Sequence, residues 1–307
     1  MNILEVNEVR KAFGNQVILD GVSFHVPEHS VFGFLGENGS GKTTTMKIIL
    51  GLLQADEGTV MVNGERVTYG QTNTNRYIGY LPDVPEYYGY MKPSEYLALC
   101  GEITGLKKNE CKKKTLELLN LVGLEKANKK IAGFSRGMKQ RLGIAQALLN
   151  EPKLLICDEP TSALDPIGRK EILDILYKVK DKTTVVFSTH ILSDVERICD
   201  NIALLHQGKI QMQGDLATIK ANHTREGLEI EFAKKEDLKC FQREANFLPN
   251  VCKEKEDNPL AIVLKGNNMA DLPNVSLQIL AKNKIVPVKF MCLEPTLEDL
   301  FMEIVKE

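Results

Sequence analysis

The chain has 307 residues, of which 43% are apolar, so it is long enough for about two globular domains. Its 39 lysines and arginines against 41 aspartates and glutamates give a formal charge of −2, a balance that offers no argument for a nucleic-acid partner. The seven cysteines are scattered and form no C-x-x-C pair, which indicates reduced thiols in a cytosol rather than a metal cluster or a disulfide framework. We expect no signal peptide, and no apolar run approaches the roughly eighteen residues of a membrane span.

The first 30 residues alternate apolar and polar side chains, with turn signals at Gly14-Asn15 and Asp20-Gly21. This pattern predicts short antiparallel strands. A further hairpin is predicted over residues 58–65, because Asn63-Gly64 is a strong two-residue turn.

Residues 36–43 complete a G-x-x-x-x-G-K-[ST] pattern directly after the apolar run 30–35. In such a loop backbone N–H groups cradle a phosphate, the lysine bridges the β- and γ-phosphates, and the threonine hydroxyl is left to bind Mg²⁺. A helix is predicted from Thr44 to Leu50, with its positive dipole end toward the anion. This context favours a nucleoside triphosphate site over a glycine-rich turn with a solvated lysine. The predicted nucleotide-binding residues here are Gly36, Asn38, Gly39, Ser40, Gly41, Lys42, Thr43 and Thr44.

The remaining pattern predicts an α/β fold with a P-loop NTPase core. Apolar residues recur at helical spacing in an insert at about 90–150, and strand character returns at 154–157, 184–188 and 202–205 with helices between, which is typical of a mostly parallel sheet. A polar, charged stretch after about residue 220 predicts a linker. We therefore expect an ATPase domain over 1–219, beginning with the antiparallel β subdomain, and a small C-terminal α+β domain over 220–307. Its predicted strands are 228–232, 261–265 and 286–290, and its predicted helices are 272–283 and 297–305.

Two carboxylates, Asp158 and Glu159, directly follow the apolar run 154–157. Asp158 suits a Mg²⁺ site and Glu159 suits a base that activates the attacking water. An acidic pair after a strand is by itself more typical of a helix N-terminus, and the phosphate loop in the same chain shifts the interpretation to an active site.

In the order and spacing of these motifs, residues 1 to about 215 resemble the nucleotide-binding subunits of ATP-binding cassette (ABC) transporters. Phe134-Ser135-Arg136-Gly137-Met138 precedes a helix as the family signature does, and Ser162-Ala163-Leu164-Asp165 follows the two acids as its D-loop. The resemblance implies that His190 is the switch histidine, rather than a core histidine, and that Phe13 stacks on adenine. It also implies that Ser135 and Gly137 face the ATP of a second copy, so that two chains sandwich two ATP molecules.

Two motifs depart from the family pattern. Asp83 stands where the family usually has a glutamine, and it is predicted to hold metal-bound water with a shorter reach. Within the signature, Arg136 replaces a usual glycine and Met138 a usual glutamine. These departures, and the segment 294–301, resemble the antibiotic-resistance and drug-export branch.

The resemblance implies a subunit that hydrolyses ATP with Mg²⁺ and powers a separate membrane-spanning permease, exporting an antibiotic or another amphipathic molecule. It would lie in the cytoplasm, peripheral on the inner face of the cell membrane, as a homodimer without nucleic acid. We expect the permease to dock at Tyr87-Tyr88-Gly89-Tyr90-Met91, although these residues could instead only pack the insert on the core. The lysines at 107–108 and 112–114 favour a solvated helix face over contact with anionic lipid. The alternatives are a soluble ABC ATPase acting on ribosomes or nucleic acid, and an importer subunit with a regulatory tail.

Overall fold

The computed structural model of the chain describes residues 1–71, 73–222, 227–245, 252–255, 258–265, 272–293, 297–298 and 300–301. The fold divides into two compact units, Met1–Leu216 and Ala217–Glu307. No helix in the described ranges is both long enough and apolar enough to cross a membrane.

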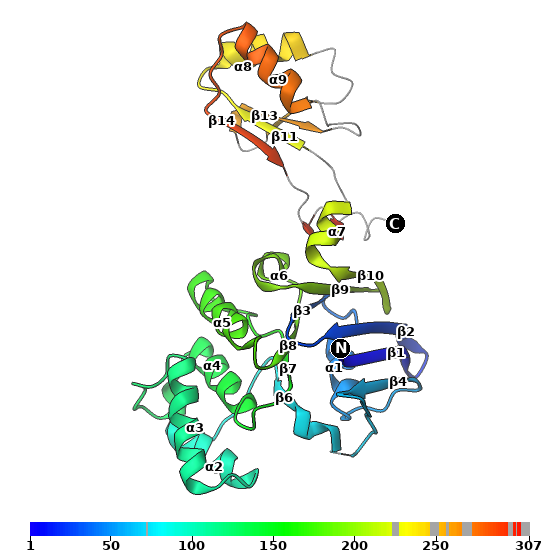
Figure 1. The fold of residues 1–307 in the computed structure, drawn as a ribbon, viewed down its shortest axis with the longest axis vertical. Helices are drawn as coiled ribbons and strands as arrows, with labels where there is room; N and C mark the ends of the chain where they lie inside the picture. The colour runs from blue at the N-terminus through cyan, green and yellow to red at the C-terminus, as the bar shows by residue number, and fades with distance from the viewer. Residues whose placement is uncertain are drawn as a thin grey trace. The chain divides into compact units, whose positions relative to one another are not determined.

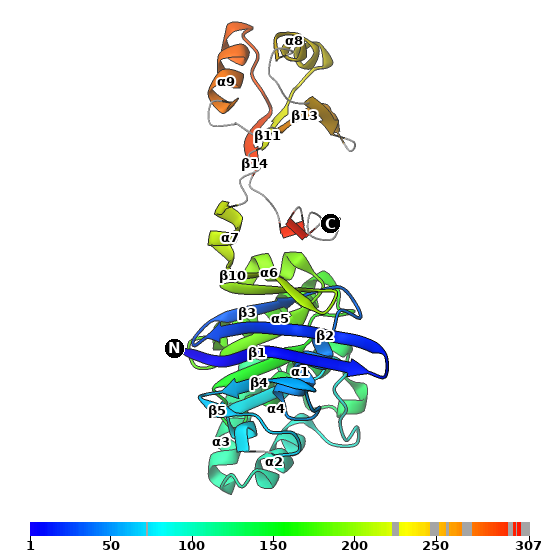
Figure 2. The same cartoon turned by 90° about the vertical axis from the view of Figure 1, so that its right-hand side faces the viewer.

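The first unit begins with an antiparallel sheet whose described strands run in the order β2-β1-β4-β5 (Figure 2). The strands are β1 (Asn2–Phe13), β2 (Gln16–Pro27), β4 (Glu57–Val62) and β5 (Glu65–Arg66). The predicted turn at Asn63-Gly64 is confirmed, because φ is 50° and 76° at these residues and Val62 pairs with Glu65.

The first two strands are antiparallel as predicted, but each has 12 residues and neither is short. The predicted turn at Asp20-Gly21 is wrong, because both residues lie inside β2. Shifts in the pairing register of β1 and β2 flank Val9, which pairs with Val22, and Gly21 adopts a φ of 75° beside them. A bulge of this kind bends a strand without ending it.

A second sheet contains the described strands β10-β9-β3-β8-β7-β6 in that order. Their bounds are β3 (Val31–Leu35), β6 (Ile78–Leu81), β7 (Leu154–Asp158), β8 (Thr184–Thr189), β9 (Asn201–His206) and β10 (Lys209–Asp215). All neighbours are parallel except β10, which runs antiparallel to β9. The predicted, mostly parallel sheet is therefore confirmed, and it brings the carboxyl ends of β3, β7 and β8 to one edge.

Helices cover both faces of this parallel sheet (Figure 1). In that view α4 and α5 lie on one face, and α1 lies on the other together with the antiparallel sheet. Side chains of both sheets and α1, including Phe32, Phe34 and Met46, share one buried core. The helices of this unit are α1 (Lys42–Ile49), α2 (Pro93–Ile103), α3 (Lys108–Leu121), α4 (Arg136–Ala147), α5 (Pro166–Val179) and α6 (Leu192–Ile198), with 3-10 turns at Asn73–Tyr77 and Ile131–Gly133. A further helix, α7 (Leu216–Asn222), begins at the last residue of the first unit and otherwise belongs to the second. The predicted helical section therefore comprises α2 to α4.

The second unit has the order strand-helix-strand-strand-helix-strand. Its elements are β11 (Gly227–Glu231), α8 (Lys235–Ala245), β12 (Cys252–Lys255), β13 (Asn258–Lys265), α9 (Leu272–Lys282) and β14 (Lys289–Leu293). The described strands pair antiparallel in the order β12-β13-β11-β14, which is the ferredoxin-like split βαβ arrangement. Side chains such as Phe232, Phe241 and Ile279 form its core beneath α8 and α9. The predicted class, a small α+β unit, agrees with this architecture.

One predicted strand of this unit is misplaced. The ladder of β14 begins at Lys289, whereas the prediction was 286–290. Val286 and Val288 are 81% and 62% exposed, and Pro287 between them has no N–H to give to a ladder. The linker predicted after about residue 220 is wrong at its start, because residues 220–222 form the end of α7 (Leu216–Asn222). The rest of that predicted linker, at 223–226, lies outside the described residues, as do five of the nine residues of the predicted helix 297–305 and half of the segment 294–301.

Candidate functional site

The phosphate loop joins β3, which is fully buried, to α1. Gly41 precedes the helix with a φ of 109°, and a Cβ atom there would lie 2.7 Å from Leu19 Cδ2, so the turn requires glycine. Asn38 and Gly39 are exposed at the tip of the loop. The hydroxyl of Ser40 is buried and has no hydrogen-bond partner among the described residues, which is the arrangement expected of a cradle for an anion.

Lys42 lies beneath this loop and is only 6% exposed. Its ammonium group donates to the carbonyl oxygens of Gly36 and Glu37, at 2.8 and 3.1 Å, and lies 3.2 Å from Glu159 Oε1. The backbone therefore fixes the position of this buried charge before any phosphate binds.

The hydroxyl of Thr43, at the start of α1, donates to Asp158 Oδ2 at 2.9 Å. Asp158 ends β7 and is 3% exposed, and its other carboxylate oxygen accepts a hydrogen bond of 2.6 Å from the hydroxyl of Ser188 on β8. A hydroxyl and a carboxylate held together in this way present hard oxygen ligands, so Thr43 and Asp158 fit a Mg²⁺ ion.

Glu159 follows in a left-handed backbone conformation with a φ of 47°. Its N–H donates to the backbone oxygen and to the hydroxyl of Ser188, at 3.2 and 3.0 Å, which holds this strained conformation in place. Glu159 Oε2 lies 3.0 Å from Nδ1 of His190. One carboxylate thus joins the lysine of the phosphate loop to the histidine that follows β8.

Ser188 is the functional residue that the sequence analysis did not single out. It is fully buried, and its hydroxyl contacts both Asp158 and Glu159. Its position two residues before His190 on an apolar strand was the available signal, but only the pairing of β7 with β8 shows that it faces the acids.

The family signature, which is expected to face a second copy, and the D-loop each lie at the start of a helix. Ser135 caps α4 by accepting a hydrogen bond of 3.2 Å from Met138 N–H, and Gly137 lies in the first turn. Asp165 caps α5 through Gly168 N–H at 2.9 Å. Within the described part of the chain, no hydrogen bond or ion pair joins these residues to the phosphate loop.

Asp83 contacts the signature rather than the predicted metal residues. Its Oδ1 lies 3.1 Å from Arg136 Nη2 and accepts from the hydroxyl of Ser162 at 3.3 Å. Arg136 also donates to the Ser162 hydroxyl, at 3.2 Å, and Gln140 donates to the backbone oxygen of Asp83 at 2.6 Å.

Phe13, the residue expected to stack on adenine, is 52% exposed at the end of β1. The Lys11 ammonium lies 5.4 Å from the centre of its ring and pairs with Asp56 at 2.7 Å. Asp56 also accepts a hydrogen bond from Ala12 N–H, so the strand end that presents the ring is anchored to the residue that precedes β4.

Burial keeps two groups beside the acids neutral. Desolvation raises the pKa of Tyr80 on β6 to about 12, with a further contribution from the nearby Asp158 carboxylate. Burial also raises the pKa of the Cys157 thiol. Neither group is therefore placed to give up a proton near neutral pH.

The five residues proposed for partner docking divide into two kinds. Tyr87 donates to Lys139 O at 2.7 Å and packs edge-on against Tyr96, so it joins the insert to α4. Tyr88 and Tyr90 are 54% and 68% exposed, with ring centres 6.0 Å apart. The exposed pair, and not Tyr87, remains free to contact another protein.

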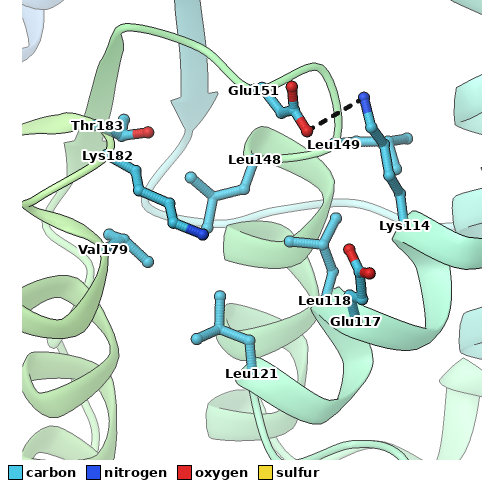
Figure 3. Close-up of a pocket in the computed structure, with 10 residues that line it drawn as sticks. All are labelled: Lys114, Glu117, Leu118, Leu121, Leu148, Leu149, Glu151, Val179, Lys182 and Thr183. Atoms are coloured by element: carbon cyan, nitrogen blue, oxygen red, sulfur yellow. Dashed lines mark ion pairs between the residues drawn. The ribbon is translucent and has the colours of Figure 1, made fainter.

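The lysine-rich helix α3 borders a pocket of about 640 Å³ (Figure 3). Leucine and valine side chains line it together with charged ones, and none of the ten lining residues belongs to the motifs above. Lys114 pairs with Glu110 and Glu151, at 3.1 and 3.5 Å, and Lys113 pairs with Glu117 at 3.8 Å. Because acids pair with these two lysines, the charges fit a solvated helix face better than a surface for anionic lipid.

Comparisons with known proteins agree with this geometry. The family model described as "ABC transporter" matches residues 19–162. The uncharacterized ABC transporter ATP-binding protein YxlF of Bacillus subtilis (strain 168) is 37% identical over 99% of both chains. The bacitracin transport ATP-binding protein BcrA of Bacillus licheniformis is 33% identical over 99% of this chain and 97% of its own.

A solved structure of an ATP-binding subunit of an ABC transporter is 35% identical, with a TM-score of 0.64, over 72% of this chain and 92% of its own. The phosphate loop, the two acids and the histidine of this chain thus lie on the fold of that family. The sequence similarity to YxlF and to BcrA extends over nearly the full length of each protein. The chain belongs to the family of ABC transporter ATP-binding proteins, and within it is similar to the antibiotic-resistance branch.

Proposed function

We propose that the chain is the ATP-hydrolysing subunit of an exporter whose membrane-spanning part is a separate permease. The observation that carries this proposal is the connected set of side chains at the edge of the parallel sheet. Glu159 lies 3.2 Å from the Lys42 ammonium, in an ion pair, and 3.0 Å from His190 Nδ1, and Thr43 is hydrogen-bonded to Asp158. Such a set suits phosphoryl transfer to water, in which positioning and electrostatics supply most of the rate.

Each residue of the site has a separate role in ATP hydrolysis. The phosphate loop from Gly36 to Thr44 binds the β- and γ-phosphates, with Lys42 neutralising their charge, and Phe13 stacks on the adenine. Mg²⁺ held by Thr43 and Asp158 would neutralise charge on the β- and γ-phosphate oxygens. Glu159 accepts the proton of the attacking water, and His190 orients that carboxylate and the γ-phosphate.

Two copies complete the sites. Ser135 and Gly137 begin α4, and the N–H groups of its first turn suit a γ-phosphate presented by a second chain. Asp165 lies at the same interface. Hydrolysis removes the shared γ-phosphate, and the pair opens.

The permease docks on the insert through Tyr88 and Tyr90, with Met91 beside them. The complex lies on the cytoplasmic face of the cell membrane. The cargo is an antibiotic or another amphipathic molecule, a proposal that the relative named for bacitracin transport supports.

The test is a pull-down of the tagged, full-length Glu159→Gln variant from detergent-solubilised native membranes, with MgATP. We expect one polytopic membrane protein to be recovered, and a paired chain in solution at saturating MgATP. Tyr88→Ala should reduce that recovery, and Tyr177→Ala, at an exposed tyrosine on α5, should not. Recovery with ribosomes or nucleic acid in a parallel pelleting assay would overturn the transport role in favour of a soluble ABC ATPase.

A further inference from the structure

Two residues that depart from the usual family pattern, Asp83 and Arg136, are in contact with each other. Asp83 follows β6 by two residues, and Arg136 is the first residue of α4. Their side chains form an ion pair of 3.1 Å, and the hydroxyl of Ser162, which follows the two acids of β7, lies within 3.3 Å of both. A glycine at position 136 has no side chain and could not make these contacts.

The pair contributes little to global stability. The side chains of Arg136 and Asp83 are 42% and 44% exposed, and ion pairs so exposed to solvent add little to the stability of a fold. The backbone beneath them is held differently. Gln140 of α4 is fully buried and donates to the backbone oxygen of Asp83 at 2.6 Å. The loop after β6 is therefore fixed to α4, and the ion pair sets how the first turn of α4 meets Ser162.

We propose that Asp83, Arg136 and Ser162 form a positioning cluster that fixes the first turn of α4 relative to the loop after Asp158 and Glu159. Ser135 and Gly137 lie in that first turn. The cluster thereby links the acids of one site to the surface that the same chain presents to the nucleotide of its partner. This inference rests on the proposed function, because that surface acts only when two copies meet.

Loss of the cluster should affect ATP hydrolysis without affecting ATP binding. Among the described residues, no hydrogen bond or ion pair joins Arg136 to Lys42 or Thr43 of the phosphate loop, so loss of the cluster should leave ATP binding to a single chain unchanged. Hydrolysis needs Ser135 and Gly137 in place and should slow. In a merely structural role, by contrast, the thermal midpoint and the affinity for ATP would fall together.

The experiment compares Arg136→Gln, Asp83→Asn and the double variant in the full chain. Each single change is expected to lower kcat about tenfold, with the Kd for a fluorescent ATP analogue within about twofold of wild type. The double variant should be no slower than the slower single variant, because both changes break the same pair. Arg136→Lys keeps the cation and should recover most of the activity.

Glu171→Gln is the matched control, because it removes another ion pair between α4 and its surroundings, the one with Arg141 at 3.7 Å. It should hydrolyse ATP as wild type does. A wild-type kcat in both single variants would overturn the cluster. So would a hundredfold lower kcat in the double variant, because two independent tenfold losses multiply. Either result would leave the proposed function intact. Absence of ATP hydrolysis or ATP-dependent pairing in the wild-type chain would overturn the proposed function, and the inference with it.

Discussion

The hydroxyl of Ser188 supports both acids of the site, so Ser188→Ala is the most informative single change. The serine is fully buried on β8 and donates to Asp158 Oδ1 at 2.6 Å. It also accepts from Glu159 N–H at 3.0 Å. Alanine fits the same space, so the change removes hydrogen bonds without a large cavity.

The expected magnitude follows from these contacts. A hydrogen bond to a buried carboxylate contributes roughly 2 kcal/mol to the free energy of unfolding. Glu159 N–H keeps its bond to the backbone oxygen of Ser188, at 3.2 Å, so only the contact with Asp158 is lost outright. For a unit of this size, about 2 kcal/mol lowers the unfolding midpoint by roughly 4–8 °C. An outer partner of a metal-binding carboxylate typically affects activity about 10- to 100-fold, and kcat should fall accordingly.

Thermal unfolding is measured by calorimetry on the full chain, with and without MgATP. The transition that nucleotide shifts upward belongs to the unit that carries the site. Steady-state phosphate release gives kcat and KM for the same preparations.

Ser193→Ala is the matched control, because Ser193 on α6 is exposed and its hydroxyl only accepts a bond of 3.3 Å from Arg169. Both its midpoint and its kcat should equal those of wild type. The assignment of Ser188 fails if Ser188→Ala unfolds and hydrolyses ATP as the control does.

Two further predictions concern the phosphate loop and the strand end near Phe13. Gly41→Ala places a Cβ atom at a residue whose φ is 109°, within 2.7 Å of Leu19, so we expect nucleotide binding to be lost in a fluorescence titration. Gly64→Ala is the control, because its φ is 76° but no atom lies near the added Cβ, and this variant should bind nucleotide normally. Hydrogen bonds from Lys11 and from a backbone N–H lower the pKa of Asp56 below its ordinary value of 3.8. Because the folded state has the lower pKa, this stabilisation is present above pH 3.8 and is lost as the pH falls through the folded value. Asp56→Asn should therefore unfold at a lower temperature than wild type at pH 6, and the difference should vanish in acid; a constant difference across the pH range would exclude this ionic contribution.

Local sequence was sufficient for the elements whose chemistry is local. The phosphate loop needs glycines at fixed spacing, and the turn at Asn63-Gly64 needs two residues with positive φ, so both can be predicted from a few neighbouring residues. The fully buried strands β3, β7 and β8 each contain an unbroken apolar stretch, which is typical of strands covered on both faces and can be recognised locally. These local features were sufficient to predict the fold class and the positions of the phosphate loop and the two acids in the sequence.

Other features depend on contacts between distant segments. Proline at 287 moved the last strand of the second unit to 289–293, where pairing with β11 is possible, although the apolar pattern favoured 286–290. At the N-terminus, Asp20-Gly21 is a turn by composition, but pairing with β1 makes it part of a strand. In both cases the hydrogen-bond ladder, and not local propensity, decides the outcome.

The sequence by itself therefore determined the chemistry of this protein: a phosphate loop, two acids after a buried strand, and a histidine after another. Only the tertiary structure decided which side chains support them. The parallel sheet places Ser188 against both acids, and the approach of α4 to the loop after β6 pairs Arg136 with Asp83. Residues 30 and 53 positions apart in the chain meet because strand order and helix packing, which depend on the whole fold, bring their elements together.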